Sequence, residues 1–275
     1  MCIKKILSIT LASVITLTSL SAQDLSVMSY NIRYNSLNDG DDLWDLRKAE
    51  LVGQLKAEEP STFGVQEAML VQMQYLNQEL SAYDYVGVGR EDGVTQGEYS
   101  AIFYLKDRFE VLQSGTFWLS ETPEKVSTGW DAALPRICTY AQFYDKALKR
   151  NFWHFNTHFD HMGQVARDES AALIIERIEQ LTDPEEMVVV SGDFNAIPSD
   201  APIMRMTKAF GDLLEVTQLK GPVGTFSGFQ LDAPLDRRID YIFARNLKPK
   251  SYSHLDTKRA NGRWISDHLP VKAVF

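Results

Sequence analysis

The sequence of 275 residues has little cysteine and a deficit of positive charge. Only Cys2 and Cys138 are present, so a small fold held together by several disulfides is excluded, and stability must come from a buried apolar core. The formal net charge is −9, whereas a general nucleic-acid binder is usually basic. An acidic chain repels polyanions at long range, so this composition argues against nucleic acid as a general partner. After residue 22 no apolar run is long enough to cross a bilayer, so we expect no stable membrane span.

The first 22 residues differ from the rest of the chain. Lys4 and Lys5 precede an apolar run from Ile6 to Leu20, and the small residues Ser21 and Ala22 follow it. This order predicts a secretory signal peptide over residues 1–22 and export to the periplasm or the cell exterior. A buried first strand or helix is the alternative, but the basic start and the lack of acidic residues favour export. Cleavage removes Cys2 and leaves Cys138 without an internal partner.

The remaining residues, 23–275, alternate between short β-type runs and helical patterns. Helices are predicted at 43–58, 68–80 and 163–181. Strands are predicted at 25–32, 62–66, 99–105, 109–119, 137–143, 152–158, 187–191, 239–244 and 270–275. Because many successive strands have no helix between them, the pattern favours an α/β fold with two antiparallel-rich sheets packed face to face and helices outside, in one domain.

Polar side chains follow, end or directly precede many of these apolar runs. Taken singly, each has an ordinary explanation as a turn former, a helix-terminal acid or a surface histidine. Together they place oxygen and imidazole groups at strand ends, which are rigid mounts for a shared site. The residues concerned are Asn31, Glu67, His158, Asp193, Asn195, Asp240, Asp267 and His268.

Around these positions the sequence resembles the endonuclease/exonuclease/phosphatase superfamily, which includes deoxyribonucleases, abasic-site endonucleases, inositol polyphosphate 5-phosphatases, neutral sphingomyelinases and deadenylases. The similar segments occur in the family's order and extend over nearly the whole chain after residue 22. They are Met28-Ser29-Tyr30-Asn31-Ile32-Arg33, Gly64-Val65-Gln66-Glu67, Gly97-Glu98-Tyr99-Ser100-Ala101-Ile102, Asn156-Thr157-His158, Ser191-Gly192-Asp193-Phe194-Asn195, Arg238-Ile239-Asp240-Tyr241-Ile242 and Ser266-Asp267-His268-Leu269-Pro270.

The resemblance implies a four-layer α/β sandwich of two mixed sheets with its active site at one end of the sheets. It also implies a metal site in which Glu67 is the principal Mg²⁺ ligand, Asn31 orients that carboxylate and helps to hold the site, and Asp267 supports the metal. Mg²⁺ prefers oxygen ligands and keeps several waters, so it can be held by the few protein ligands expected here. Mn²⁺ is expected to substitute for it.

The resemblance gives the catalytic roles to a second group of residues. Asp193 and Asn195 match the pair that positions the attacking water and contacts the phosphate, with Asp193 as the favoured base. Asp240 is expected to hold His268, and Glu98 to accept a hydrogen bond from His158 within about 3.2 Å. Both imidazoles would then stay positively charged beside the phosphate.

Two arginines are weaker candidates for substrate binding. Arg136 lies between predicted strands, where it would clamp a substrate phosphate, and Arg167 opens the helix at 163–181 and would reach the pocket behind His158. An ordinary surface charge is the alternative for both. No nucleophilic serine or cysteine motif competes, because Cys138 stands alone and there is no Gly-x-Ser-x-Gly.

The sequence therefore predicts an exported, Mg²⁺-dependent phosphoesterase that hydrolyses a phosphodiester or phosphomonoester by attack of water. A small-molecule or lipid-head-group substrate is favoured over nucleic acid, and a monomer over an oligomer. A secreted nuclease acting on DNA or RNA is the alternative. A catalytically inactive binding module is a third, and disfavoured because no residue of the expected set is missing. The segment Phe117–Leu134 matches nothing shared across the superfamily.

Overall fold

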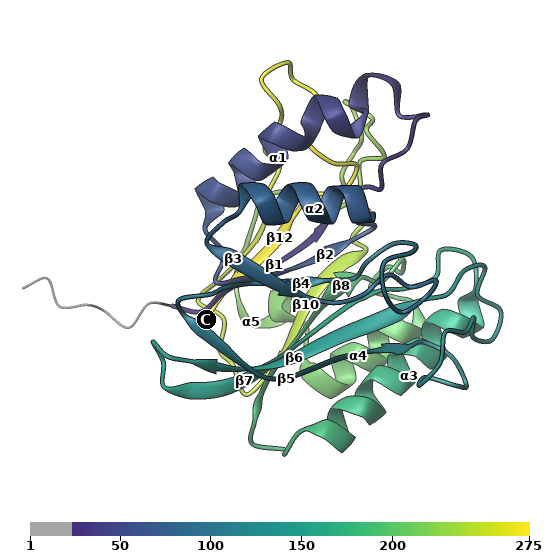
Figure 1. The fold of residues 1–275 in the computed structure, drawn as a ribbon, viewed down its shortest axis with the longest axis vertical. Coiled ribbons are helices and arrows are strands. Elements are labelled where there is room, and N and C mark those ends of the chain that lie inside the picture. Colours follow the sequence, from purple (N-terminus) through teal and green to yellow (C-terminus); the bar gives the residue numbers. More distant parts are fainter. Residues whose placement is uncertain (1–23) are drawn as a thin grey trace, which may run out of the picture.

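Two β-sheets stacked face to face form the centre of the molecule (Figure 1). The structure, a computed structural model, describes residues 24–275, so the predicted signal peptide lies outside the described residues. The first sheet has seven strands in the order β3-β4-β2-β1-β12-β11-β9, and the second has five in the order β10-β8-β7-β6-β5. Only β1 with β2, β11 with β9 and β7 with β8 are parallel pairs, so both sheets are mixed and antiparallel-rich, as predicted.

The strands are β1 (Ser26–Asn31), β2 (Thr62–Gln66), β3 (Tyr83–Val86), β4 (Ile102–Leu105), β5 (Phe109–Trp118), β6 (Ile137–Asp145), β7 (Arg150–His158), β8 (Met187–Asp193), β9 (Leu219–Lys220), β10 (Asp240–Arg245), β11 (Ser251–His254) and β12 (Val271–Val274). The helices are η1 (Gly40–Asp42), α1 (Trp44–Glu58), α2 (Leu70–Glu79), α3 (Gln164–Leu181), α4 (Ala201–Phe210) and α5 (Leu213–Val216).

Three apolar clusters correspond to the three interfaces between four layers. Helices α1 and α2 cover the outer face of the seven-stranded sheet, and α3 and α4 cover that of the five-stranded sheet (Figure 1). The third cluster, which includes Val27, Phe143, Val189 and Ile242, lies between the sheets. Cys138 is free, so burial of this apolar surface and not a disulfide stabilises residues 24–275. The predicted four-layer sandwich is confirmed.

The alternation of side chains along the strands decides where polar groups meet. In β1, Met28 and Tyr30 pack against the helices, so Val27, Ser29 and Asn31 point to the opposite face, between the sheets. In β8, Val188 and Val190 face the helices, and the opposite row begins with Met187 and Val189 and ends at Asp193. Each inward row is therefore apolar at one end and polar at the other, which places a site between the sheets at one end of the sandwich.

A buried polar network joins the two sheets just below that site. Asn156 of β7 donates to the carbonyls of Val65 and Ala101 at 2.9 and 3.0 Å, and its Oδ1 accepts from Gln66 at 2.7 Å and from Ser191 at 2.9 Å. The histidine two residues earlier extends the network, because its Nε2 lies 2.8 Å from the Ser191 hydroxyl. These hydrogen bonds cross the interface between the sheets and fix how the sheets are stacked, although Gln66 Oε1 is buried without a partner in residues 24–275.

Gly64 of β2 faces this network, and only a glycine fits there. A Cβ at this position would lie 2.1 Å from Asn156 Oδ1 and 2.7 Å from Ser191 Oγ. We expect Gly64→Ala to lower the free energy of unfolding by at least about 1–3 kcal/mol, because the added methyl forces the sheets apart. In the exposed part of α1, Gly53→Ala meets nothing within 4 Å and should instead stabilise the protein by about 0.5–1 kcal/mol. Urea denaturation of both variants checks the contrast, and equal stabilities would contradict it.

The helices predicted at 43–58, 68–80 and 163–181 are confirmed as α1, α2 and α3 to within two residues, and the predicted strands as β1, β2, β4 to β8, β10 and β12 with small shifts at their ends. The prediction missed α4, although Asp200 precedes it and Pro202 opens it. It also missed the short strands β3, β9 and β11. None of the described helices is long and apolar enough to cross a membrane.

Candidate active site

Strand register brings the predicted site residues together. In the five-stranded sheet His158, Asp193 and Asp240 stand side by side at the ends of β7, β8 and β10. In the seven-stranded sheet Asn31 pairs with Gln66, so Glu67 follows at the same end. His158, Asp193 and Glu67 open into one pocket of about 510 Å³, whereas Asn31 and Asp240 lie behind its lining. The lining residues are Arg33, Tyr34, Glu67, Glu98, Leu134, Arg136, His158, His161, Asp193, Asn195, Phe226, Arg237, Ile239, Asp267 and His268.

The Glu67 carboxylate is held at both oxygens. Its Oε1 accepts from Asn31 Nδ2 at 3.0 Å and its Oε2 from the backbone N–H of Tyr34 at 3.0 Å. Asn31 thus orients this carboxylate as expected, while its own amide oxygen accepts from the Arg33 N–H at 3.0 Å. Arg33, Glu67 and Asn195 all adopt left-handed backbone conformations, with φ of 57, 63 and 46°. Such conformations are unfavourable for residues with a Cβ, and their concentration here is typical of a functional site.

Asp193 lies at the centre of the pocket. Its Oδ1 accepts from the Asn195 N–H at 2.9 Å, and its Oδ2 accepts from Asn31 Nδ2 at 2.9 Å. The same Oδ2 lies 3.5 Å from His158 Nε2 and 3.7 Å from His268 Nε2. Burial raises the pKa of Asp193 to about 7, against the opposing effect of the His268 charge. A carboxylate of this pKa is a suitable general base at neutral pH.

His268 is the charged histidine of the site. Its Nδ1 lies 2.9 Å from Asp240 Oδ2, as predicted. Burial opposes the imidazolium, but the carboxylates of Asp240 and Asp193 outweigh this effect and raise the pKa of His268 well above its usual value. Asp240 therefore fixes the ring through Nδ1 and leaves a positively charged Nε2–H facing the pocket.

The expected pairing of Glu98 with His158 is wrong in its geometry. The shortest distance, between Glu98 Oε2 and His158 Nδ1, is 3.7 Å, too long for a hydrogen bond. Arg90 takes both oxygens of Glu98 instead, at 2.8 and 2.9 Å. Burial, together with the charges of Arg136 and Arg90, lowers the pKa of His158 well below its usual value, so this imidazole is neutral and not charged as expected. Its Nε2, 3.1 Å from Asn195 Nδ2, then acts as an acceptor.

Of the two arginines predicted to bind substrate, only Arg136 lines the pocket. Arg136 is buried and lines the pocket, with Nε 3.2 Å from Asp160 Oδ2 and Nη2 3.0 Å from His161 Nδ1. Its Nη1 has no hydrogen-bond partner within residues 24–275. The prediction for Arg167 is wrong, because its Nη1 donates to the Asp160 carbonyl at 2.9 Å and the residue lines a different hollow, beside α4. It supports the loop behind the pocket rather than reaching into it.

Several pocket residues carried no clear signal in the sequence. Arg33 lies within a recognised segment, but nothing in the spacing showed that its side chain would face Glu67 and Asp267, each 4.0 Å from Nη1. Phe226 packs edge-on against His268, with ring centroids 5.0 Å apart, and Arg237 lies over Phe226. Both come from a loop that the strand and helix patterns left unassigned, so only the tertiary fold places them here.

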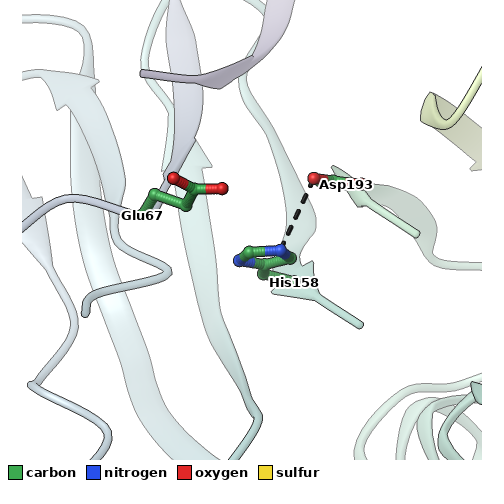
Figure 2. A group of neighbouring side chains, drawn as sticks. All are labelled: Glu67, His158 and Asp193. Atoms are coloured by element: carbon green, nitrogen blue, oxygen red, sulfur yellow. Dashed lines mark ion pairs between the residues drawn. The ribbon is translucent and has the colours of Figure 1, made fainter. Parts of the chain in front are cut away.

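The residues present fit a divalent cation. Ligand atoms of Glu67, His158 and Asp193 lie within 4.8 Å of one another, and Figure 2 shows Glu67 pointing toward the other two side chains. Burial raises the pKa of Asp267 to about 6, as it raises that of Asp193 to about 7. The negative charges of these two carboxylates are therefore poorly solvated. Such a cluster lowers its energy by binding a hard cation through its oxygens. Asp193, Asp240 and His268 form a second group of this size, but there the histidine is already bonded to Asp240.

Comparison with known proteins agrees with this geometry. The mannosyl-6-phosphatase Bt3783 of Bacteroides thetaiotaomicron is 36% identical, with a TM-score of 0.86 over 91% of this chain and 99% of that one. The fold and the pocket define a metal-dependent enzyme that hydrolyses phosphate esters. The chain belongs to the Endonuclease/Exonuclease/phosphatase family, whose sequence profile matches residues 28–268.

Two further relatives show how widely the fold is shared. The endonuclease/exonuclease/phosphatase from Bacteroides vulgatus is 38% identical, with a TM-score of 0.87 over 92% of this chain and 98% of that one. Protein L388 of Acanthamoeba polyphaga mimivirus is 26% identical over 255 residues, which are 84% of this chain and 92% of the viral protein.

Proposed function

We propose that this protein is an exported, Mg²⁺-dependent phosphatase that removes phosphate from a small, sugar-like phosphomonoester. The observation that carries the proposal is the set of cationic donors Arg33, Arg136, Arg237 and His268, which line the pocket beside the acidic cluster. A phosphomonoester carries nearly two negative charges, one more than a diester, so it gains more from these cations. The volume of about 510 Å³ is also typical of a small-molecule site.

The comparisons support the same class of substrate. The solved structure named as a mannosyl-6-phosphatase shares more than a third of its residues with this chain over nearly its whole length. A phosphorylated sugar has a compact leaving group that the rim of the pocket can surround, and Phe226 and Leu134 supply apolar surface there. Nucleic acid is a poorer fit because the chain's net charge of −9 repels a polyanion.

The chain's own residues divide the chemistry between them. Asp193 accepts a proton from the water molecule that attacks phosphorus, and Asn195 helps to position this water. The P–O bond to the alcohol breaks, and the charged Nε2–H of His268 donates to the phosphate and gives its proton to the departing oxygen. Arg136 Nη1, which has no partner in the described chain, donates to another oxygen of the phosphate. Mg²⁺ bound through Glu67, with Asp267 supporting it, would supply neutralisation of charge on the transferred phosphoryl group. Preorganised donors of this kind lower the barrier because they need no rearrangement during the reaction.

Export rests on the sequence alone. Lys4, Lys5 and the apolar run over residues 6–20 support a signal peptide that directs the chain to the periplasm or the cell exterior. Mass spectrometry of the protein recovered from outside the cytoplasm should find an N-terminus close to residue 23. A full-length chain confined to the cytoplasm would exclude export without affecting the enzymatic proposal.

A substrate panel separates the phosphatase from the alternative of a secreted nuclease. With Mg²⁺, we expect kcat/KM for sugar phosphomonoesters such as mannose 6-phosphate to exceed that for a simple diester by at least about tenfold, since one charge-assisted hydrogen bond contributes about 1.5–3 kcal/mol. Fluorogenic DNA and RNA should be cleaved slowly even at low salt. Efficient digestion of either polymer, with no turnover of monoesters, would establish the nuclease instead.

Arg136 gives the sharpest test of the substrate's charge. Arg136→Met should raise KM for a phosphomonoester about 10–100-fold, because the buried Nη1 loses its contact with a phosphate oxygen. Arg205→Met is the matched control, since Arg205 pairs with Asp168 on the protein surface at 2.9 Å, away from this pocket. Steady-state kinetics on both variants checks the prediction, and equal KM values would remove Arg136 from substrate binding.

A further inference from the structure

Arg47 of α1 is fully buried directly behind the pocket's backbone. Its guanidinium donates to four backbone carbonyls: Ile32 at 2.6 Å, Arg33 at 2.9 Å, Asp42 at 2.9 Å and Ile265 at 3.3 Å. No carboxylate within residues 24–275 accepts a hydrogen bond from it. Burying a cation without a bonded acid is unfavourable for stability, so the position of this side chain points to a role beyond packing.

The carbonyls that Arg47 holds belong to two segments that meet only in the folded protein. Ile32 and Arg33 follow Asn31 at the end of β1, and Ile265 lies two residues before Asp267. One guanidinium therefore links the segment after β1, which lies beside Glu67, to the segment that carries Asp267. A planar group with five N–H donors is suited to joining several carbonyls in a fixed arrangement.

Gln72 of α2 holds the same place from a second helix. This side chain is fully buried, and its Nε2 donates to the Arg33 carbonyl at 2.8 Å. The Arg33 carbonyl thus accepts from Arg47 and from Gln72 together. Arg33 itself is in the left-handed region, with φ of 57°, which an arginine does not adopt without such support.

The peptide group between Arg33 and Tyr34 connects these donors to Glu67. A trans peptide is planar, and its carbonyl and N–H point in opposite directions. The carbonyl of this peptide is held by Arg47 and Gln72, while the N–H on its other side donates to Glu67 Oε2 at 3.0 Å. Rotation of the peptide plane would break the hydrogen bonds on both sides at once. Arg47 and Gln72, which bind the carbonyl, therefore also fix the hydrogen bond from the N–H to Glu67.

We propose that Arg47 and Gln72 are positioning residues that hold the Arg33–Tyr34 peptide so that its N–H fixes the Glu67 carboxylate for the divalent cation. The proposal rests on the metal dependence of the proposed function. Neither residue lines the pocket, so neither contacts the substrate or the cation. Gln72 acts on the cation site through the backbone alone, whereas the charge of Arg47 also acts on the Asp267 carboxylate.

Mn²⁺ binding, measured by the loss of the free-ion signal in electron paramagnetic resonance, tests the proposal without an activity assay. Arg47→Met should weaken Mn²⁺ binding about 10–100-fold, the range found when a group that orients a metal ligand is removed. Arg47→Lys, which keeps the charge but reaches fewer carbonyls, should fall between Arg47→Met and the unmodified protein. Arg259→Met is the matched control, because Arg259 is also buried and also anchors α1, through Glu50 and the Leu46 carbonyl.

The outcomes distinguish this proposal from the one on which it rests. If the unmodified protein binds no Mn²⁺, the metal-dependent function itself is wrong. If it binds Mn²⁺ and Arg47→Met binds equally well, only the positioning role is overturned, as it also is if Arg259→Met weakens binding to the same extent. Should Arg47→Met fail to fold, Gln72→Leu decides, since it removes one donor to the Arg33 carbonyl and no charge. Unchanged Mn²⁺ affinity in Gln72→Leu would overturn the proposal.

Discussion

Asp193→Asn should lower kcat about 10²–10⁴-fold while the fold stays intact, the usual range for removal of a general base. The amide cannot accept a proton from water, yet it preserves the shape of the side chain. Its one oxygen keeps the hydrogen bond from either the Asn195 N–H or Asn31 Nδ2, which bond to different oxygens of Asp193. Because burial raises the pKa of Asp193 to about 7, the substitution also removes an unfavourably buried charge. The melting temperature should therefore stay level or rise.

Steady-state kinetics and thermal denaturation, measured on the same preparation, check this expectation. Asp168→Asn is the control, since Asp168 pairs with Arg205 on the protein surface and faces away from the pocket. A near-normal rate in Asp193→Asn would remove the residue from the base role. Loss of activity together with a fall in melting temperature of many degrees would show that Asp193 is structural.

The central strands and the main helices were predictable because local pattern and tertiary role agree in them. In β8, Val188, Val189 and Val190 are all buried, and the polar residues that follow are the ones that reach the pocket. Short strands at or next to a sheet edge, such as β11 (Ser251–His254), carry too few residues for their alternation to stand out, and their partner strands are close only in the folded chain. Sequence alone therefore predicted the layers better than their edges.

The site residues were predictable as a set, but their pairings were not. Asp240 and His268 form the expected pair, with both side chains buried and 2.9 Å apart. Glu98 was expected to bind His158 in the same way, yet Arg90 competes for that carboxylate with two shorter and fully charged hydrogen bonds. Arg90 lies eight residues before Glu98, outside the segment Gly97–Ile102 that carries the resemblance, so that segment does not reveal this pairing. The same reason explains why Arg167 was placed in the pocket although a backbone carbonyl holds it elsewhere.

The difference between the two histidines has a physical cause that motifs do not carry. His268 has the carboxylates of Asp240 and Asp193 nearby, whereas His158 has Arg136 and Arg90 among its charged neighbours. One imidazole is therefore charged and the other neutral at the same pH, and the pocket contains one cationic donor and one acceptor instead of two equal groups. This asymmetry gives the two sides of a bound phosphate different partners.

Removal of divalent metal should abolish turnover, because the buried carboxylates of Asp193 and Asp267 are arranged for a cation that no side chain replaces. Protein stripped with EDTA should recover activity on addition of Mg²⁺ or Mn²⁺ but poorly with Ca²⁺, whose looser geometry holds phosphate oxygens less rigidly. The control is an EDTA-treated sample returned to Mg²⁺ excess, which should regain its full rate. Full turnover in excess chelator would contradict the metal-dependent mechanism.

The same carboxylates predict how metal binding depends on pH. Burial raises the pKa of Asp193 to about 7 and that of Asp267 to about 6, both above their value of about 3.9 in an unfolded chain. Without metal, the folded state therefore binds more protons than the unfolded state between about pH 4 and pH 7. The stability from these two groups is fully present below about pH 4 and is lost as the pH rises from about 4 through 7. A cation takes the place of those protons.

The increase in melting temperature on adding Mg²⁺ should consequently be large at pH 8 and small at pH 5, where protons compete for the same oxygens. Thermal denaturation with and without Mg²⁺ across this range measures the difference, with Glu67→Gln as the variant in which the metal-induced increase should largely disappear at every pH. An increase of equal size at pH 5 and pH 8 would show that the cation binds outside this cluster.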